Sequence, residues 1–186
     1  MHTGQGVGSL GFYVGDVDGD GRVDVIHPWQ CDGRRVCILY YLAANGFNPS
    51  PNVVTGQGTG RVAGFLTGDI YGDSRTSLIQ LWNCDNNLCV IYYTSALGFE
   101  SGNYKSSQGT GAVAYLTGDI DGSGRTSVIH LWNSSGRLSI LWYTPKVNSL
   151  SYQVAFSSNA AQVVAVSSAI VPQGVQDGIH VLSVNQ

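Results

Sequence analysis

The chain has 186 residues, of which 43% are hydrophobic and 11% are charged, and its formal net charge is −3. This composition is typical of a globular domain with a buried core, and no apolar run is long enough to span a membrane as a helix. We therefore expect no membrane span. Lysine and arginine form no basic patch, so we expect no nucleic-acid partner.

The acidic residues indicate the fold class. Eleven of the twelve acids are Asp, and Glu100 is the only Glu. Asp and Gly favour turns, whereas Glu is the better helix former. Together with 25 glycines and ten tyrosines, this bias predicts an all-β fold whose strands are separated by Asp/Gly turns.

An internal repeat of about fifty residues organises the chain. The stretches 3–29, 55–82 and 107–132 align almost residue for residue, and the tryptophan that ends each stretch recurs after 53 and then 50 residues. An eroded fourth copy follows, in which His180 takes the place of His130 but the acids are replaced. We expect a single repeat domain with units at approximately 3–54, 55–106 and 107–157 and a partial unit at 158–186.

Each unit contains four short segments with strand character. In the first unit they are GFYVGDV (11–17), VDVIHPW (23–29), RVCILYYL (35–42) and the weaker NPSPNVV (48–54). Four antiparallel strands of this length, repeated at a fixed period, are typical of β-propeller blades. The sequence therefore predicts an all-β propeller with three full blades and one partial blade per chain. A β-sandwich is the alternative, but a sandwich gives no reason for the repeat.

The first unit carries a dense acidic loop, DVDGDGRVD, at residues 16–24. Ca²⁺ takes about six to eight oxygen ligands, and acids at loop positions 1, 3, 5 and 9 with a carbonyl oxygen at position 7 can supply most of them. These ligands would be Asp16, Asp18, Asp20, Asp24 and the carbonyl oxygen of Arg22. Because four close carboxylates repel one another, we expect a calcium ion here. The alternative is an Asp-rich turn that holds no metal.

The later copies of this loop contain fewer acids. In the third unit the candidate ligands are Asp119, Asp121, Ser123 and the carbonyl oxygen of Arg125. Ser127 replaces the last acid, so a calcium site and an empty turn both stay open there. In the second unit Tyr71 and Ser77 replace two of the acids, and we expect no strong site.

The stretch GDVDGDGRVDVI (15–26) resembles the calcium loop of FG-GAP/VCBS-type repeats, and the resemblance extends over about residues 3–156. Such repeats form integrin-like and lectin-like β-propellers in extracellular proteins and bacterial toxins. The resemblance implies a propeller fold and bound calcium. It does not identify a ligand, because such propellers serve as lectins, adhesion modules and scaffolds.

Four cysteines form two closely spaced pairs. Cys31 and Cys37 flank one predicted turn, and Cys84 and Cys89 flank the equivalent turn of the second unit. If each turn joins two antiparallel strands, each pair faces across its own hairpin at a spacing that a disulfide can close. A zinc site would need a different spacing. We expect two disulfides and a secreted, extracellular protein; reduced buried thiols are the alternative.

A polar residue and a tryptophan recur two residues apart in every unit. The pairs are His27 with Trp29, Gln80 with Trp82, and His130 with Trp132. Residues two apart share one face of a strand, so each pair can hold a sugar between an aromatic plate and a hydrogen-bonding group. Packing between blades explains the same recurrence, and both interpretations stay open.

These features favour a calcium-stabilised extracellular carbohydrate-binding propeller, with repeated sites between blades that capture glycans multivalently. The alternative is a protein-interaction or scaffold module of a larger adhesin or toxin. No nucleophile elbow and no spare pair of carboxylates are present, so we do not expect an enzyme.

The count of units bears on closure of the propeller. Propellers have about four to eight blades, whereas this sequence supplies three full units and a partial one. We expect a homodimer that closes one ring, with a seam between the region 163–184 and the partner's region 4–17. The alternatives are a four-bladed ring within one chain and a fragment of a longer chain.

Overall fold

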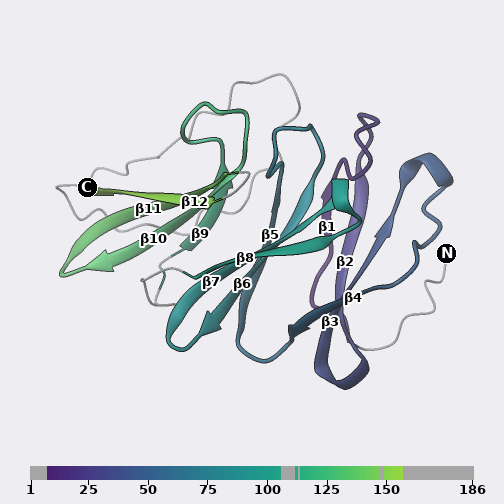
Figure 1. Cartoon of the computed structure of the whole chain (residues 1–186), viewed down its shortest axis with the longest axis horizontal. Helices are drawn as coiled ribbons and strands as arrows, with labels where there is room; N and C mark the ends of the chain where they lie inside the picture. Colours follow the sequence, from purple (N-terminus) through teal and green to yellow (C-terminus); the bar gives the residue numbers. More distant parts are fainter. Residues whose placement is uncertain (1–7, 106–111, 113, 147–148, 157–186) are drawn as a thin grey trace, which may run out of the picture. The chain divides into compact units, whose positions relative to one another are not determined.

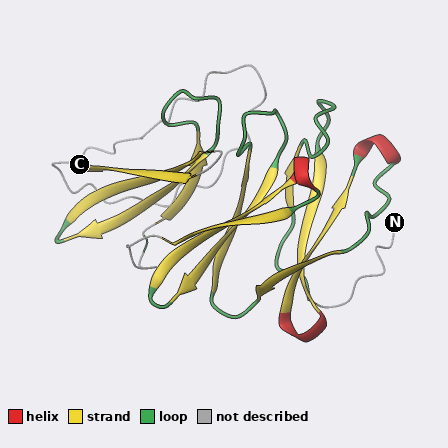
Figure 2. Cartoon of the chain, viewed as in Figure 1, coloured by secondary structure: helices red, strands yellow, loops and turns green. Residues whose placement is uncertain are grey.

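A computed structural model describes residues 8–105, 112, 114–146 and 149–156. Within these residues the chain is all-β: twelve strands form three four-stranded antiparallel sheets, and the only helical elements are short 3₁₀ turns (Figures 1 and 2). No helix in the described part is long and apolar enough to cross a membrane. The prediction of an all-β fold is confirmed.

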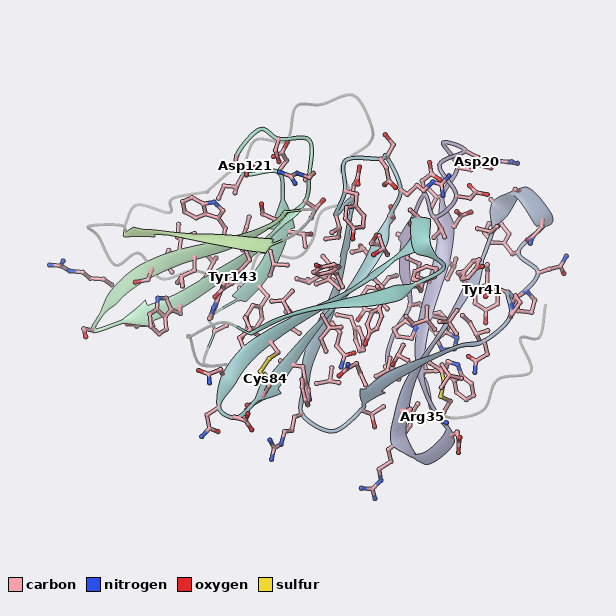
Figure 3. The ribbon with its side chains drawn as sticks, viewed as in Figure 1. Asp20, Arg35, Tyr41, Cys84, Asp121 and Tyr143 are labelled. Carbon is pink, nitrogen blue, oxygen red and sulfur yellow. A yellow bond between two sulfur atoms is a disulfide. The ribbon has the colours of Figure 1, made fainter. Side chains whose placement is uncertain are left out.

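The first sheet has the strand order β1-β2-β3-β4, which follows the sequence. Its strands are β1 (Tyr13–Gly15), β2 (Asp24–Cys31), β3 (Arg35–Tyr41) and β4 (Val53–Gly58). Two 3₁₀ turns connect them: η1 (Asp32–Arg34) joins β2 to β3, and η2 (Ala43–Asn45) follows β3. The acidic loop lies between β1 and β2, at the opposite end of the sheet from η1; Asp20 and Arg35 mark these two ends in Figure 3.

The second and third sheets repeat this topology. The second contains β5 (Val62–Gly68), β6 (Ser77–Cys84), β7 (Asn87–Thr94) and β8 (Glu100–Lys105), with η3 (Ser95–Leu97) after β7. The third contains β9 (Ala114–Gly118), β10 (Ser127–Ser134), β11 (Arg137–Lys146) and β12 (Ser149–Phe156). The first two sheets belong to one compact unit and the third sheet to another. The predicted partial unit, including His180 and the predicted seam at 163–184, lies outside the described residues.

The last strand of the first unit lies further along the chain than the sequence pattern predicts. The pattern placed it at 48–54, but β4 is Val53–Gly58. Pro49 and Pro51 have no N–H to donate to a ladder, so the strand begins after them. A bulge between Arg35 and Cys37 then allows β4 to continue, with Cys37 opposite Val54 and Arg35 opposite Gly58.

The first two sheets pack face to face around a shared core. Buried residues of both sheets form it, including Ile26 and Ile38 from the first sheet and Leu78, Ile91 and Tyr93 from the second. Two aromatic contacts cross this interface: the ring centroids of Tyr13 and Phe65 lie 6.0 Å apart, and those of Tyr40 and Phe99 lie 5.1 Å apart. Apolar burial on both sides is the main stabilising term of such an interface.

A close backbone approach joins the same two sheets beside the acidic loop. The Thr76 N–H donates to the Asp16 carbonyl oxygen at 2.5 Å. A Cβ added to Gly15 would lie 2.3 Å from the Thr76 hydroxyl oxygen and 2.4 Å from its methyl group. Only glycine leaves room for this contact, which explains its presence immediately before the acidic loop.

Both predicted disulfides are present. Cys31 bonds to Cys37 with a Cα–Cα distance of 5.7 Å, and Cys84 bonds to Cys89 with a Cα–Cα distance of 5.8 Å (Figure 3). The strand register places Trp29 opposite Cys37 and Trp82 opposite Cys89. Each bond therefore runs diagonally across its hairpin, and the prediction of two disulfide-bonded hairpins is confirmed.

Candidate functional site

The first acidic residue builds the backbone of the acidic loop. One carboxylate oxygen of Asp16 accepts the N–H groups of Gly19 and Asp20 at 2.7 and 3.1 Å, and the other accepts that of Gly21 at 2.7 Å. Gly19 and Gly21 have left-handed backbone conformations, with φ of 82° and 81°. The Asp16 carboxylate thus supplies acceptors for the amides of a tight turn, as aspartate commonly does in loops.

The second loop has the same construction although it has fewer acids. Asp69 accepts the N–H groups of Gly72, Asp73 and Ser74 at 2.7, 3.1 and 2.7 Å, and Ser74 is left-handed with φ of 63°. In the third loop Asp119 accepts the N–H groups of Ser123 and Gly124 at 3.0 and 2.7 Å. In all three loops the first aspartate therefore accepts at least two amides of the loop backbone.

Three of the predicted calcium ligands lie together. Asp16, Asp18 and Asp24 each place one carboxylate oxygen in this cluster, and the three oxygens lie within 4.8 Å of one another. Carboxylate oxygens are the ligands that Ca²⁺ prefers, and each carboxylate keeps lone pairs beyond those used by the backbone amides. The donor set fits calcium in kind. Elsewhere in the described part of the chain, no other cluster of three such groups is present.

Asp24 has a structural role that the sequence pattern does not reveal. Its side chain is fully buried, and its two oxygens accept the N–H groups of Val17 and Ala43, each at 2.8 Å. The carboxylate therefore ties the acidic loop to the turn after β3. In the second sheet the equivalent Ser77 hydroxyl accepts the Ser95 N–H at 3.4 Å, which preserves one of these two contacts.

The remaining acid of the first loop pairs with an arginine. The Asp20 carboxylate accepts a hydrogen bond from Nε of Arg22 at 2.7 Å and lies 2.5 Å from its Nη2. This pairing lowers the pKa of Asp20 and places its carboxylate outside the cluster of three. Burial of the Asp18 carboxyl raises its pKa, and the charges of the neighbouring acids add to this effect. Arg75 of the second loop also packs on Gly19, because a Cβ there would lie 3.3 Å from Arg75 Nε.

The candidate ligands of the third loop form a more open arrangement. Asp121 and Ser123 are exposed, Asp119 and Arg125 are half-buried, and the Ser123 N–H donates to both Asp119 and Asp121, at 3.0 and 3.1 Å. Figure 3 shows Asp121 in the loop at the end of the third sheet. The two carboxylates of this loop share one backbone amide, and Ser127 stands where the first loop has a further acid, Asp24.

The polar members of the three predicted ligand-binding pairs are buried. His27, Gln80 and His130 all lie inside the protein, and burial lowers the pKa of both histidines. His27 Nε2 lies 3.1 Å from the Ser9 hydroxyl, and the Tyr93 hydroxyl donates to Gln80 Oε1 at 2.6 Å. In this conformation none of the three side chains reaches a ligand at the surface.

The tryptophans of the same pairs are half-buried at equivalent positions of the three sheets. Trp29 Nε1 donates to the side-chain oxygen of Asn52 at 3.0 Å, and Trp82 Nε1 donates to the Gly60 carbonyl oxygen at 2.8 Å. Asn52 is exposed and lies 23 residues from Trp29 in the sequence. No local pattern marks it, which is why sequence reasoning did not include it.

Comparisons with known proteins leave the site to be interpreted from its own geometry. No protein-family model matches the chain, and no curated protein or solved structure matches it.

Proposed function

We propose that the chain is a calcium-stabilised, extracellular carbohydrate-binding module of the β-propeller type, with a contact position at the tryptophan of each unit. The observation that carries the proposal is the recurrence of a half-buried Trp29, Trp82 and Trp132 at one register of the three sheets. Trp82 also packs against the core between the first two sheets, so Trp29 is the stronger candidate of these two. An exposed indole face can stack on the C–H groups of a sugar ring. Several weak equivalent positions would capture glycans by avidity.

Trp29 is the best-defined contact position. Its hydrogen bond to Asn52 uses the amide oxygen, so the amide nitrogen of this exposed side chain can donate to a sugar hydroxyl. His27 is buried beneath and positions the surface residues instead of touching the sugar. The proposal involves no catalytic step.

Calcium would stabilise the loop end of the first sheet. Asp16, Asp18 and Asp24 would hold the ion, which would neutralise their mutual repulsion without taking part in binding chemistry. A ligand that binds only the folded state raises its stability by mass action. The two disulfides fit an extracellular protein, where calcium is abundant.

Chelation tests the calcium part of the proposal. We expect a chelator to lower the melting temperature of the wild-type chain, and Asp18→Asn to abolish most of this difference. Asn keeps an acceptor for the Asp20 N–H, which lies 3.2 Å from the Asp18 oxygen, and removes only the charge. Asp73→Asn is the matched control, because Asp73 accepts the Arg75 N–H in the second loop, where no three-acid cluster exists among the described residues. Identical melting curves with and without chelator would refute calcium stabilisation.

Glycan binding tests the tryptophan positions. We expect specific signals on a glycan array, competition by a free monosaccharide, and a change in tryptophan fluorescence on adding that sugar. Trp29→Ala and Asn52→Ala should weaken binding. Asn48→Ala is the control, because Asn48 is also exposed but donates to the Asn45 carbonyl oxygen, away from Trp29. Equal binding by Asn52→Ala and Asn48→Ala would show that Asn52 does not contact the sugar.

A protein-interaction or scaffold module is the second candidate. It is favoured by three exposed apolar side chains of the first sheet, Phe12, Val14 and Val54. Exposed large apolar side chains are typical of association sites when they gather in one patch. Absence of any sugar-competed signal on the array would favour this candidate over carbohydrate binding.

A further inference from the structure

Equivalent residues of the first two sheets differ sharply in exposure. Phe12 and Phe65 are equivalent, because each lies four residues before the first aspartate of its acidic loop. Phe12 is nevertheless 62% exposed, whereas Phe65 is 8% exposed. Phe47 and Phe99 follow the equivalent glycines Gly46 and Gly98, yet Phe47 is 39% exposed and Phe99 is 2% exposed. The local structure is shared, so the difference lies in what covers each residue.

The first sheet covers the two buried phenylalanines. Tyr13 contacts Phe65, and Tyr40 contacts Phe99. Tyr13 and Tyr40 lie opposite Ile26 on neighbouring strands, so all three share one face of the first sheet. This face and the Phe65 face of the second sheet together form the described interface.

The face of the first sheet that carries Phe12 corresponds to the Phe65 face of the second. Phe12 stacks on His27, with ring centroids 4.3 Å apart, and Phe65 lies opposite Gln80, the equivalent of His27. We call the surface made by Phe12, Val14, Phe47 and Val54 the open face. Trp29, two residues from His27, shares this face, so a sugar bound at Trp29 and a second copy of the chain would compete for it. His27 and Tyr41 lie on the same face but are buried. The exposed apolar side chains of the open face are therefore the ones that a partner could contact.

The turn that carries Phe47 supports a role for the open face. Phe47 has a left-handed backbone with φ of 60°, and Phe99 has the same conformation with φ of 65°. A bulky residue adopts this conformation at an energetic cost. In the second sheet that cost is offset because Phe99 is buried against Tyr40. Figure 2 shows the η3 turn beside the first sheet and the η2 turn on the other side of that sheet.

A complementary face is present on the third sheet. Leu116 and Trp142 occupy the positions of Tyr13 and Tyr40, because each lies opposite Ile129, the equivalent of Ile26. Both side chains are half-buried in the described part of their unit. The third sheet therefore carries the same type of face that covers Phe65 and Phe99.

We propose that the open face is a self-association surface, which takes the Leu116 and Trp142 face of a second copy of this chain. Leu116 of one copy would then contact Phe12 of the other, and Trp142 would contact Phe47, as Tyr13 and Tyr40 contact Phe65 and Phe99 within one chain. The interface is head-to-tail: each copy supplies one face of each kind, and we expect the smallest closed assembly, a dimer.

The first experiment measures mass by light scattering on a sizing column at several protein concentrations. We expect a dimer of twice the 19.7 kDa chain mass. Phe12→Asp should raise the dimer dissociation constant about 100-fold, because it places an unpaired charge in an apolar contact. Val23→Asp is the matched control: Val23 is 61% exposed but lies in the acidic loop, so this variant should dimerise normally.

Phe47→Asp is the second variant, because Asp tolerates a left-handed backbone and the fold should persist. Circular dichroism should show native strand content for every variant that is compared. A monomeric wild-type chain at all concentrations overturns the proposal, and so does a Phe12→Asp chain that folds and dimerises normally.

Mixing two variants tests the head-to-tail arrangement. Phe12→Asp damages one face, and Trp142→Asp or the alternative Leu116→Asp damages the other. Each variant should be monomeric alone. Their mixture should form a dimer, because each retains the face that the other needs. A mixture that stays monomeric, although both folded variants are present, excludes this pairing of faces.

Discussion

The first and second sheets have the same strand order, the same disulfide-bonded hairpin and the same acidic-loop backbone, but they use different side chains at equivalent positions. His27 stands where Gln80 stands, and the buried Asp24 stands where Ser77 stands. The comparison shows that loop shape depends on few positions, chiefly Asp16 and Asp69. The exposure of a residue, in contrast, depends on whether another sheet covers it.

The largest effect should come from the phenylalanines that precede β1 and lie in β5. Phe65→Ala removes a ring from the core between the sheets and should lower the free energy of unfolding by about 3–4 kcal/mol. Phe12→Ala removes an exposed ring and should cost less than about 1 kcal/mol at a concentration where the chain is monomeric. Urea unfolding of both variants measures the difference. Similar losses would mean that Phe12 is covered as Phe65 is.

The glycines before the acidic loops should give the next effect. Gly15→Ala places a Cβ 2.3 Å from the Thr76 hydroxyl oxygen and should cost about 2–3 kcal/mol, because the two sheets must separate to admit it. Among the described residues, the equivalent Gly118→Ala meets only the Ile129 Cδ1 atom, at 3.8 Å, and should be nearly neutral. Thermal unfolding of the two variants is the measurement. A neutral Gly15→Ala would show that the close approach is not required for packing.

Each disulfide should contribute about 2 kcal/mol, because each closes a short loop in the unfolded chain. Cys31→Ala with Cys37→Ala removes one bond, and Cys84→Ala with Cys89→Ala removes the other. Sequence separations of 6 and 5 predict nearly equal losses. Alkylation followed by intact-mass measurement should find no free thiol before reduction. Four alkylated thiols in the unreduced chain would contradict both bonds.

The smallest effect concerns pH and the pair His27 and Gln80. Phe12, Tyr41 and the Ser9 hydroxyl surround His27, and burial lowers its pKa below the ordinary 6.5. As the pH falls through the ordinary histidine pKa of about 6.5, the unfolded chain binds this proton more readily than the folded chain. Stability is therefore present above that pH and is lost as the pH falls.

His27→Gln should remove this acid loss. At neutral pH the new amide can accept from the Tyr41 hydroxyl, as Gln80 accepts from Tyr93, so stability should not fall. Unfolding curves at pH 7.5 and 5.5 provide the test. His130→Gln is the parallel change in the other compact unit, because burial also lowers the His130 pKa. An unchanged acid loss in His27→Gln would assign the effect to other groups.

Several features follow from the sequence alone because short-range interactions determine them. The repeat period, the Asp/Gly turns and the cysteine spacing predict the all-β fold and the hairpin disulfides, which the structure confirms. In the same way, Asp16 binds amides only three to five residues ahead of it. Such contacts repeat wherever the local sequence repeats, so the third loop could be recognised from the first.

Other features depend on contacts between segments that are distant in the sequence. Asp24 is buried as an acceptor for Ala43, Asn52 binds Trp29, and β4 begins only after Pro51. Phe12 and Phe65 have the same local setting but opposite exposure, because only Phe65 has Tyr13 of another sheet against it. The sequence determined which residues share a face, but tertiary packing decided which of those faces became core, since burial requires a second surface that no local pattern supplies.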